Sequence, residues 1–263
     1  MNELYHHGVK GQRWGVRRYQ NPDGSLTEEG RKRYSKNKDL VLKSNTNIFR
    51  VSRKDESKLY PGSYAAVKSK NDYNKYIGVY AGLLANEGKK VIEKQISAVG
   101  DLKIPSHSNS INLMNKTLDS LNFRSDIKKQ NQLKKYLSNE ISEENNKSDR
   151  LFKRGIKEFD EYIDSGKIGR NLYDTLNVSF SDKRDNIMRP IINEYISNLK
   201  NNGYAAILDM NDTKYGVYNS DFPIIIADAS KFKVSNIVEL TDKEISQAKS
   251  QLDDDFLKSL RWE

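Results

Sequence analysis

The sequence predicts an α+β fold behind a basic N-terminal tail, and three observations lead to this prediction. Short apolar runs typical of strands lie near both ends of the chain, at 47–52, 63–67, 91–99, 204–209, 222–227 and 233–240. The middle, from about 105 to 182, carries apolar residues at helical spacing. Residues 1 to about 43 lack apolar periodicity, and basic and aromatic residues alternate there with glycine.

The composition of the chain excludes several classes of protein and several kinds of functional site. The 263 residues suit one large domain or one domain with a tail, and 36% apolar residues with a net charge of +9 indicate a lean core under a solvated surface. No apolar run approaches the roughly 20 residues of a membrane helix, and the first ten residues lack the apolar core of a secretion signal, so we expect neither. Without cysteine, and with three histidines, we expect no disulfide, thiolate nucleophile or metal site.

The front of the chain alternates strands and turns after the tail. Ile48 to Ser52 is predicted to be a strand, Pro61-Gly62 a turn, and 63–67 a second strand. Residues 71–86 place tyrosines and leucines at helical spacing, and 91–99 is a weaker strand candidate.

The middle and the end follow with helices and then strands. Three apolar helical faces lie between about 105 and 182, and Gly166 ends the third. A further helix is expected at 184–201 and ends at Asn202-Gly203. Beyond the last strands, Thr241 and Glu244 have the spacing of a capping box that opens a final helix.

The opening segment, residues 5–34, carries an unusual motif. It reads YHHGVKGQRWGVRRYQNPDGSLTEEGRKRY. This resembles a short module found at the starts or ends of phage and prophage proteins of Gram-positive bacteria. The resemblance implies a phage origin and association with the virion or its packaged contents, and it implies no reaction.

The folded part carries a second likeness, in GYAAIL (203–208) and SDFPIIIADASKFK (220–233). A glycine–aromatic strand precedes an acidic residue beside an apolar strand, which resembles the ADP-ribosyltransferase family in its divergent phage and toxin versions. Arg50, within 48–52, resembles the first-strand arginine that holds the dinucleotide. The resemblance implies a split mixed β-sheet within residues 44–263, a helical insertion at about 105–182, and NAD as the substrate.

The resemblance also implies roles for individual residues. Breaking the nicotinamide–ribose bond develops positive charge on the ribose, which a carboxylate stabilises. In the sequence pattern, Asp221 is the nearest counterpart of the family's catalytic glutamate, and its side chain is one carbon shorter. Arg50 would hold the pyrophosphate or ribose hydroxyls, with Ser63 beside it. Tyr64, Tyr73 and Tyr76 are the candidates for stacking on the nicotinamide, and no metal is needed.

Each candidate also has a structural interpretation, which the sequence leaves open. Arg50 also fits a surface arginine in an alternating strand. Tyr73 and Tyr76 fit the packing face of a helix. Asp221 fits a turn that it would close with its polar neighbours.

Three functions follow from these observations. The first is a phage-encoded ADP-ribosyltransferase that modifies a host macromolecule, most plausibly a protein, in the bacterial cytoplasm or after packaging in the virion. The second is a non-enzymatic accessory or anti-defence protein that uses the fold as an interaction module, with residues 5–34 binding a phage structural protein. The third is nucleic-acid binding through the basic tail, where Trp14 and Tyr19 would stack on bases.

Overall fold

The computed structural model describes residues 38–44, 46–53, 58–67, 90–142, 147–181, 184–209 and 222–250. The predicted helix at 71–86, the loop at 210–219, most of the tail and the candidates Tyr73, Tyr76 and Asp221 lie outside these ranges.

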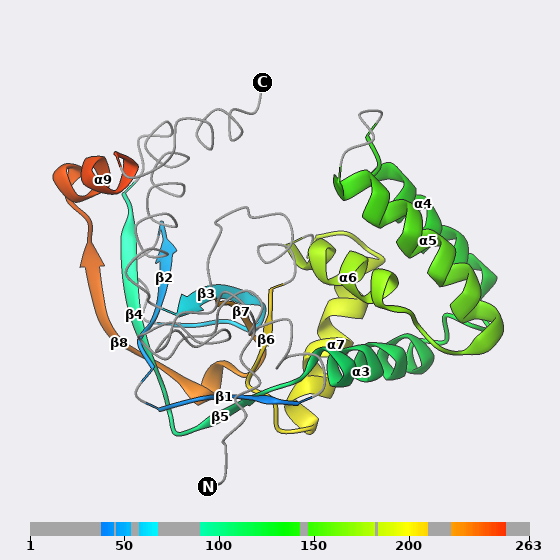
Figure 1. Ribbon diagram of the computed structural model, residues 1–263, viewed down its shortest axis with the longest axis horizontal. Coiled ribbons are helices and arrows are strands. Elements are labelled where there is room, and N and C mark those ends of the chain that lie inside the picture. The colour runs from blue at the N-terminus through cyan, green and yellow to red at the C-terminus, as the bar shows by residue number, and fades with distance from the viewer. Residues whose placement is uncertain are drawn as a thin grey trace, which may run out of the picture.

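Six strands form the central sheet. They are β2 (Ile48–Ser52), β3 (Ser63–Val67), β4 (Ile92–Ala98), β6 (Ala206–Leu208), β7 (Pro223–Ile226) and β8 (Phe232–Glu239). All six were predicted from the sequence. Their order in the sheet is β6-β7-β3-β2-β4-β8, so strands from both ends of the chain interleave, as expected (Figure 1).

The direction of the strands corrects one prediction. Every pairing among the named strands is antiparallel, so the expectation of a mixed sheet is wrong for the part of the chain that the structure describes. The parallel contact described there is an isolated bridge between Lys103 and Tyr204. Apolar alternation identifies a strand but carries no information about the direction in which its neighbour runs.

A two-stranded ribbon, which the sequence analysis missed, covers part of the sheet. It pairs β1 (Leu40–Leu42) with β5 (Leu102–Ile104). Leu42 is only 4% exposed, so residues assigned to the end of the tail contribute to the core. The folded part therefore begins before residue 43, the boundary that composition suggested.

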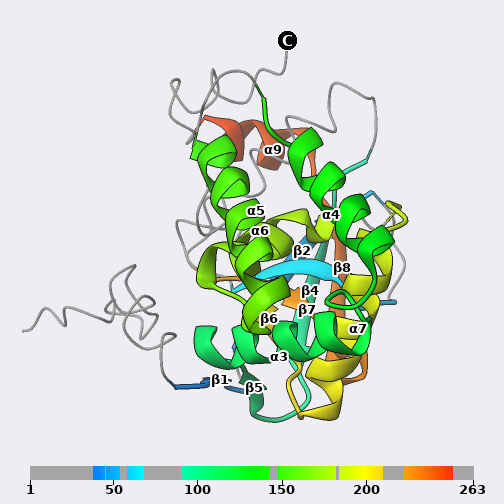
Figure 2. The same ribbon diagram turned by 90° about the vertical axis from the view of Figure 1, so that its right-hand side faces the viewer.

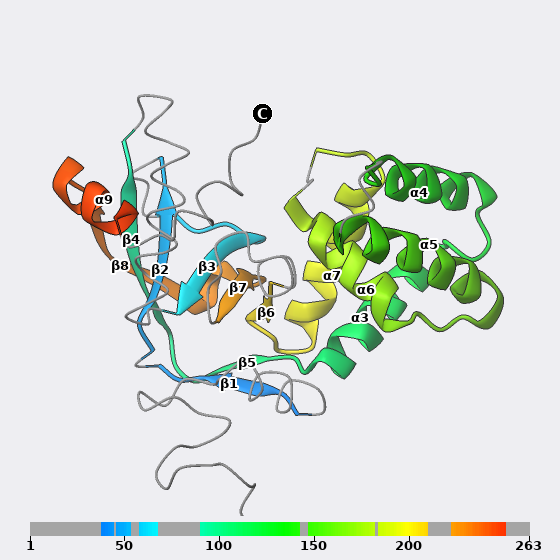
Figure 3. The same ribbon diagram turned by 45° about the horizontal axis from the view of Figure 1, so that its top comes forward.

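The helices between β5 and β6 form a lobe beside the sheet. They are α3 (His107–Ser120), α4 (Ile127–Asn139), α5 (Lys147–Ser165), α6 (Arg170–Val178), the 3-10 turn η1 (Ser179–Ser181) and α7 (Met188–Asn201). Figures 1 and 3 show this lobe to one side of the strands, and Figure 2 views the molecule from the lobe. The helical region is confirmed, but it extends past residue 182, because α7 shares the core of the lobe. No helix within the described ranges has the length and apolar character needed to cross a membrane.

Local signals fix the ends of several elements. Pro190 lies in the first turn of α7, where a missing backbone N–H costs nothing. Gly203 follows α7 with a φ of 78°, which a side chain would disfavour, and Tyr204 N–H donates to the carbonyl of Leu199. The turn η2 (Ala229–Lys231) leads into β8, and α9 (Asp242–Lys249) begins with the predicted capping box. The hydrogen bond from the Thr241 N–H lowers the pKa of Glu244.

Two cores lie on opposite faces of the sheet. On the first, the ribbon face, Ala65, Ile224 and Ile226 pack with residues of β1 and β5. On the second, the lobe face, Ile207 and Ile225 join the core of the helical lobe. Successive residues of a strand alternate between these faces, so the register determines the face of each candidate side chain.

Candidate functional site

Arg50 occupies the middle of β2, in the interior of the sheet. Its neighbours along the strand, Ile48 and Ser52, point with it to the ribbon face. The guanidinium is half-buried, and its Nη1 donates to the backbone carbonyl of Tyr64 over 2.6 Å. Among the residues that the structure describes, no carboxylate lies within ion-pair distance of Arg50. Because a half-buried arginine is rarely left without a negative charge, the site favours an anion.

A second cation lies directly across from Arg50. Lys94 of β4 is its register partner and is only 4% exposed. Paired residues on neighbouring antiparallel strands bring their Cβ atoms to within about 5.5 Å, and like charges in that arrangement destabilise a sheet. An anion bound on this face would be attracted by both cations. Ser63 of β3 faces the same side and is buried, so it adds a hydroxyl to this face.

Tyr64 is close to Arg50 through its backbone but not through its ring. Its register partner in β7 is Ile225, a residue of the lobe face, so the tyrosine side chain lies on the face opposite the guanidinium. Of the predicted site residues, the structure therefore brings Arg50 and Ser63 to one face and Tyr64 to the other. Tyr73, Tyr76 and Asp221 are not among the described residues.

The strand that follows Asp221 lies close to the strand that carries Arg50. β3 pairs with β2 on one side and with β7 on the other. Near the first residue of β2, the N–H of Val67 donates to the carbonyl of Phe222 over 3.2 Å, and Val67 is the register partner of Ile48. The first residues of β7 and of β2 therefore lie at the same end of the sheet, separated by one strand.

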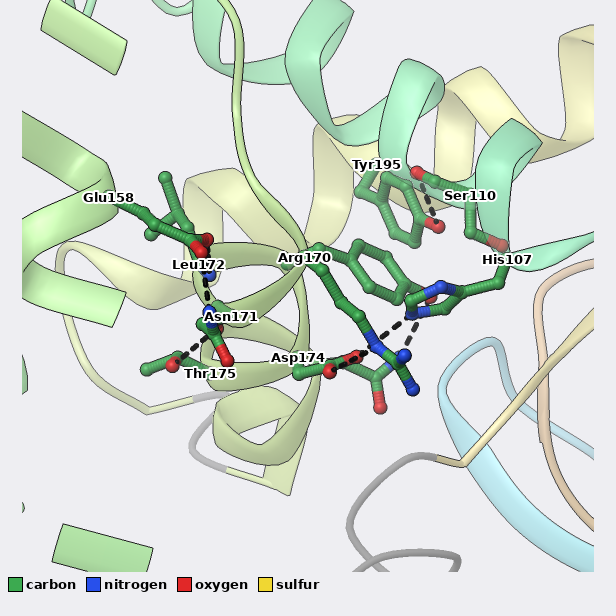
Figure 4. Close-up of polar contacts among 11 residues, drawn as sticks. His107, Ser110, Glu158, Arg170, Asn171, Leu172, Asp174, Thr175 and Tyr195 are labelled. Atoms are coloured by element: carbon green, nitrogen blue, oxygen red, sulfur yellow. Dashed lines mark hydrogen bonds and ion pairs between the residues drawn. The ribbon is translucent and has the colours of Figure 1, made fainter. Parts of the chain in front are cut away.

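A polar cluster in the helical lobe was not predicted from the sequence. The carboxylate of Asp174, in α6, is fully buried, and His107, the first residue of α3, places its Nε2 3.0 Å from Oδ1 of this carboxylate. Arg170, one turn before Asp174, places its Nε 3.5 Å from Oδ2. Figure 4 shows the two side chains converging on the carboxylate from different helices. The i,i+4 spacing of Arg170 and Asp174 was a visible signal, but no local pattern indicates a contact between residues 67 positions apart.

Tyr173 packs against the imidazole of His107, and Tyr195 packs against Tyr173. The ring of Tyr173 meets that of His107 edge to face, with centroids 5.2 Å apart. Burial raises the pKa of Tyr173 to about 12, and its hydroxyl accepts a hydrogen bond from Asn177. Burial raises the pKa of Tyr195 as well, and this tyrosine donates to the carbonyl of Ser110 over 3.3 Å. The contact with Tyr173 restricts the orientation of the His107 ring.

Asp39 fixes the start of α3, and with it the position of His107. It accepts hydrogen bonds from the backbone N–H of Ser106, the amide of Asn109 and the hydroxyl of Tyr204, at 2.8 to 2.9 Å. Partial burial opposes ionisation of Asp39, but these hydrogen bonds outweigh it and lower its pKa. The segment before β1 is thereby tied to the first turn of α3.

The described residues contain no group of three histidine, aspartate or glutamate side chains placed to hold a metal ion. No family model, curated protein or solved structure matches the chain.

Proposed function

We propose that the chain is an ADP-ribosyltransferase-like protein that binds NAD and transfers ADP-ribose to a host macromolecule, most plausibly a protein. The interleaved sheet supports this most directly. It places β2, which carries Arg50, one strand away from β7, which follows Asp221. An NAD site built from the two ends of the chain requires this juxtaposition.

The charges on the ribbon face suit the dinucleotide. Arg50 and Lys94 lie opposite each other in neighbouring strands, and the described chain provides no carboxylate for Arg50. A pyrophosphate carries negative charge on several oxygens and can accept from a guanidinium and from the hydroxyl of Ser63. We infer that Arg50 binds this group while its Nη1 remains bonded to the carbonyl of Tyr64.

The reaction assigns a separate role to the acid. In the transition state, the bond between nicotinamide and ribose breaks and positive charge accumulates on the ribose. Asp221, which precedes β7 in the sequence, would stabilise that charge, and its shorter side chain would make turnover slow. The carboxylate acts mainly in the transition state, so its removal should reduce turnover more than binding.

The N-terminal module, residues 5–34, is the part of the chain that we expect to bind a partner protein. Residues 5–34 would bind a phage structural protein and so bring the domain into the virion or to its host target. If Asp221 does not support turnover, the same nucleotide site would serve a non-enzymatic interaction module. Nucleic-acid binding by the tail is the third proposal, and its affinity should fall steeply as salt rises.

Nicotinamide release in the presence of host lysate tests the reaction. The wild type is expected to release nicotinamide from NAD. Asp221→Asn should still bind NAD but lose release, because it retains the shape and deletes the charge, and Asp221→Glu should be at least as active as the wild type. Binding of NAD without release by any of these proteins would favour the interaction module.

A further inference from the structure

The cluster of His107, Asp174 and Arg170 has unused bonding capacity. Nε2 of His107 is held by Asp174, while its Nδ1 has no hydrogen-bond partner among the residues that the structure describes. The side chain of Arg170 is 59% exposed, and its ion pair with Asp174 runs through Nε. A purely structural link between α3 and α6 would need only the contact between His107 and Asp174. It would not explain why the exposed Arg170 lies at the same carboxylate.

The buried carboxylate determines which ring nitrogen carries the proton. Asp174 is fully buried, and its two oxygens lie 3.0 Å from Nε2 of His107 and 3.5 Å from Nε of Arg170. When Nε2 donates its proton to this carboxylate, the lone pair of the neutral imidazole lies on Nδ1. Tyr173 restricts rotation of the ring from its other side. The result is an oriented base whose lone pair has no partner in the described chain.

We propose that His107, Asp174 and Arg170 form a second functional centre, which takes a molecule carrying both an anionic oxygen group and a hydroxyl. Arg170 binds the anionic group, a phosphate or a carboxylate, through its Nη donors. The hydroxyl proton moves to Nδ1 of His107, the O–H electron pair stays on the oxygen, and Asp174 keeps its negative charge beside the imidazolium. This centre does not rest on the NAD site at Arg50.

The small number of histidines makes the test specific. The chain has three, so His6→Gln with His7→Gln leaves His107 as the only imidazole. Nitrogen-15 spectra of this double variant at pH 8 should show a protonated Nε2 and an unprotonated Nδ1. Addition of sodium phosphate, or of sodium acetate in a second titration at the same ionic strength, should shift the imidazole signals along a saturating curve.

Two variants separate binding by Arg170 from general charge effects. Arg170→Ala should weaken the response at least tenfold without changing the thermal midpoint by more than a few degrees, because this side chain is mostly exposed. Arg189→Ala should leave the response unchanged, since this arginine of α7 is exposed and its side chain donates to Asn186, which is not part of the cluster. Saturation by phosphate alone assigns a phosphate ester, and saturation by acetate alone assigns a carboxylate.

Three results would overturn the proposal. They are a proton on Nδ1, a response to both anions that never saturates, and a response that Arg170→Ala leaves intact. Each would assign the cluster a purely structural role in joining α3 to α6.

Discussion

Replacing Gly155 by alanine should loosen the contact between α5 and α6. Gly155 is buried in α5 and faces Thr175 of α6, which is itself fully buried. A Cβ atom at Gly155 would lie 2.9 Å from Cβ and 3.1 Å from Cγ2 of Thr175, and closer still to its Oγ1. Thr175 cannot rotate away freely, because its hydroxyl donates to the carbonyl of Asn171 over 2.7 Å.

Two opposing terms determine the size of the effect. Alanine is about 1 kcal/mol more favourable than glycine inside a helix. Overpacking a core costs about 1–3 kcal/mol, and the contact with three atoms of one buried side chain belongs in the upper half of that range. The net expectation is a loss of about 1–2 kcal/mol in the free energy of unfolding.

Urea unfolding measures this change, and two further variants show its origin. Arg154→Ala, on the exposed side of the same helix, should change the free energy of unfolding by less than about 0.5 kcal/mol. Adding Thr175→Ala to Gly155→Ala removes the two contacting atoms beyond Cβ, so the double variant should lose about 1 kcal/mol less than the sum of the single changes. A Gly155→Ala protein more stable than the wild type would show that the helices are not in close contact.

Two further predictions concern the sheet and the buried tyrosines. Ile225→Asp should prevent folding, because Ile225 is 7% exposed between two strands and an unpaired charge there costs several kcal/mol. The control Val41→Asp, at a site that is 52% exposed, should fold. A soluble Ile225→Asp protein that unfolds cooperatively would contradict this prediction. The folded state keeps Tyr173 protonated up to pH about 12, while the unfolded chain loses that proton near pH 10. The stability that this tyrosine contributes is thus complete below pH 10 and is lost as the pH rises through 12. Tyr173→Phe should flatten this decline in pH-dependent unfolding, and an equally steep decline would refute the assignment.

The sequence predicted the parts of the fold that local patterns encode. The strand around Arg50, the apolar strand at Ile225 and the capping box at Thr241 each depend on residues within a few positions of one another. β1 and β5 were missed, because three-residue strands such as Leu40–Leu42 are too short to show alternation. Strand direction was also wrong, since it depends on how distant segments meet.

The helix α6 and its site were missed for a different reason. Six consecutive residues of this helix, 172–177, are buried, and they include Asp174, Thr175 and Asn177. A helix covered on several sides has no single apolar stripe, so periodicity does not reveal it. The contact of Asp174 with His107 joins residues 67 positions apart, and only the packing of α3 beside α6 creates it.

Calorimetric titration of NAD into the wild type, Arg50→Ala and Arg50→Lys tests the central claim most directly. The wild type should bind saturably, and Arg50→Ala should weaken binding by roughly 10- to 150-fold, which corresponds to the loss of a charge-assisted hydrogen bond. Arg50→Lys should fall between them, because it keeps the charge and loses the forked donors. Arg189→Ala, which removes an equal charge from the exposed side of α7, should bind as the wild type does. Equal NAD affinity in the wild type and a folded Arg50→Ala protein, or no binding by the wild type, would contradict the account.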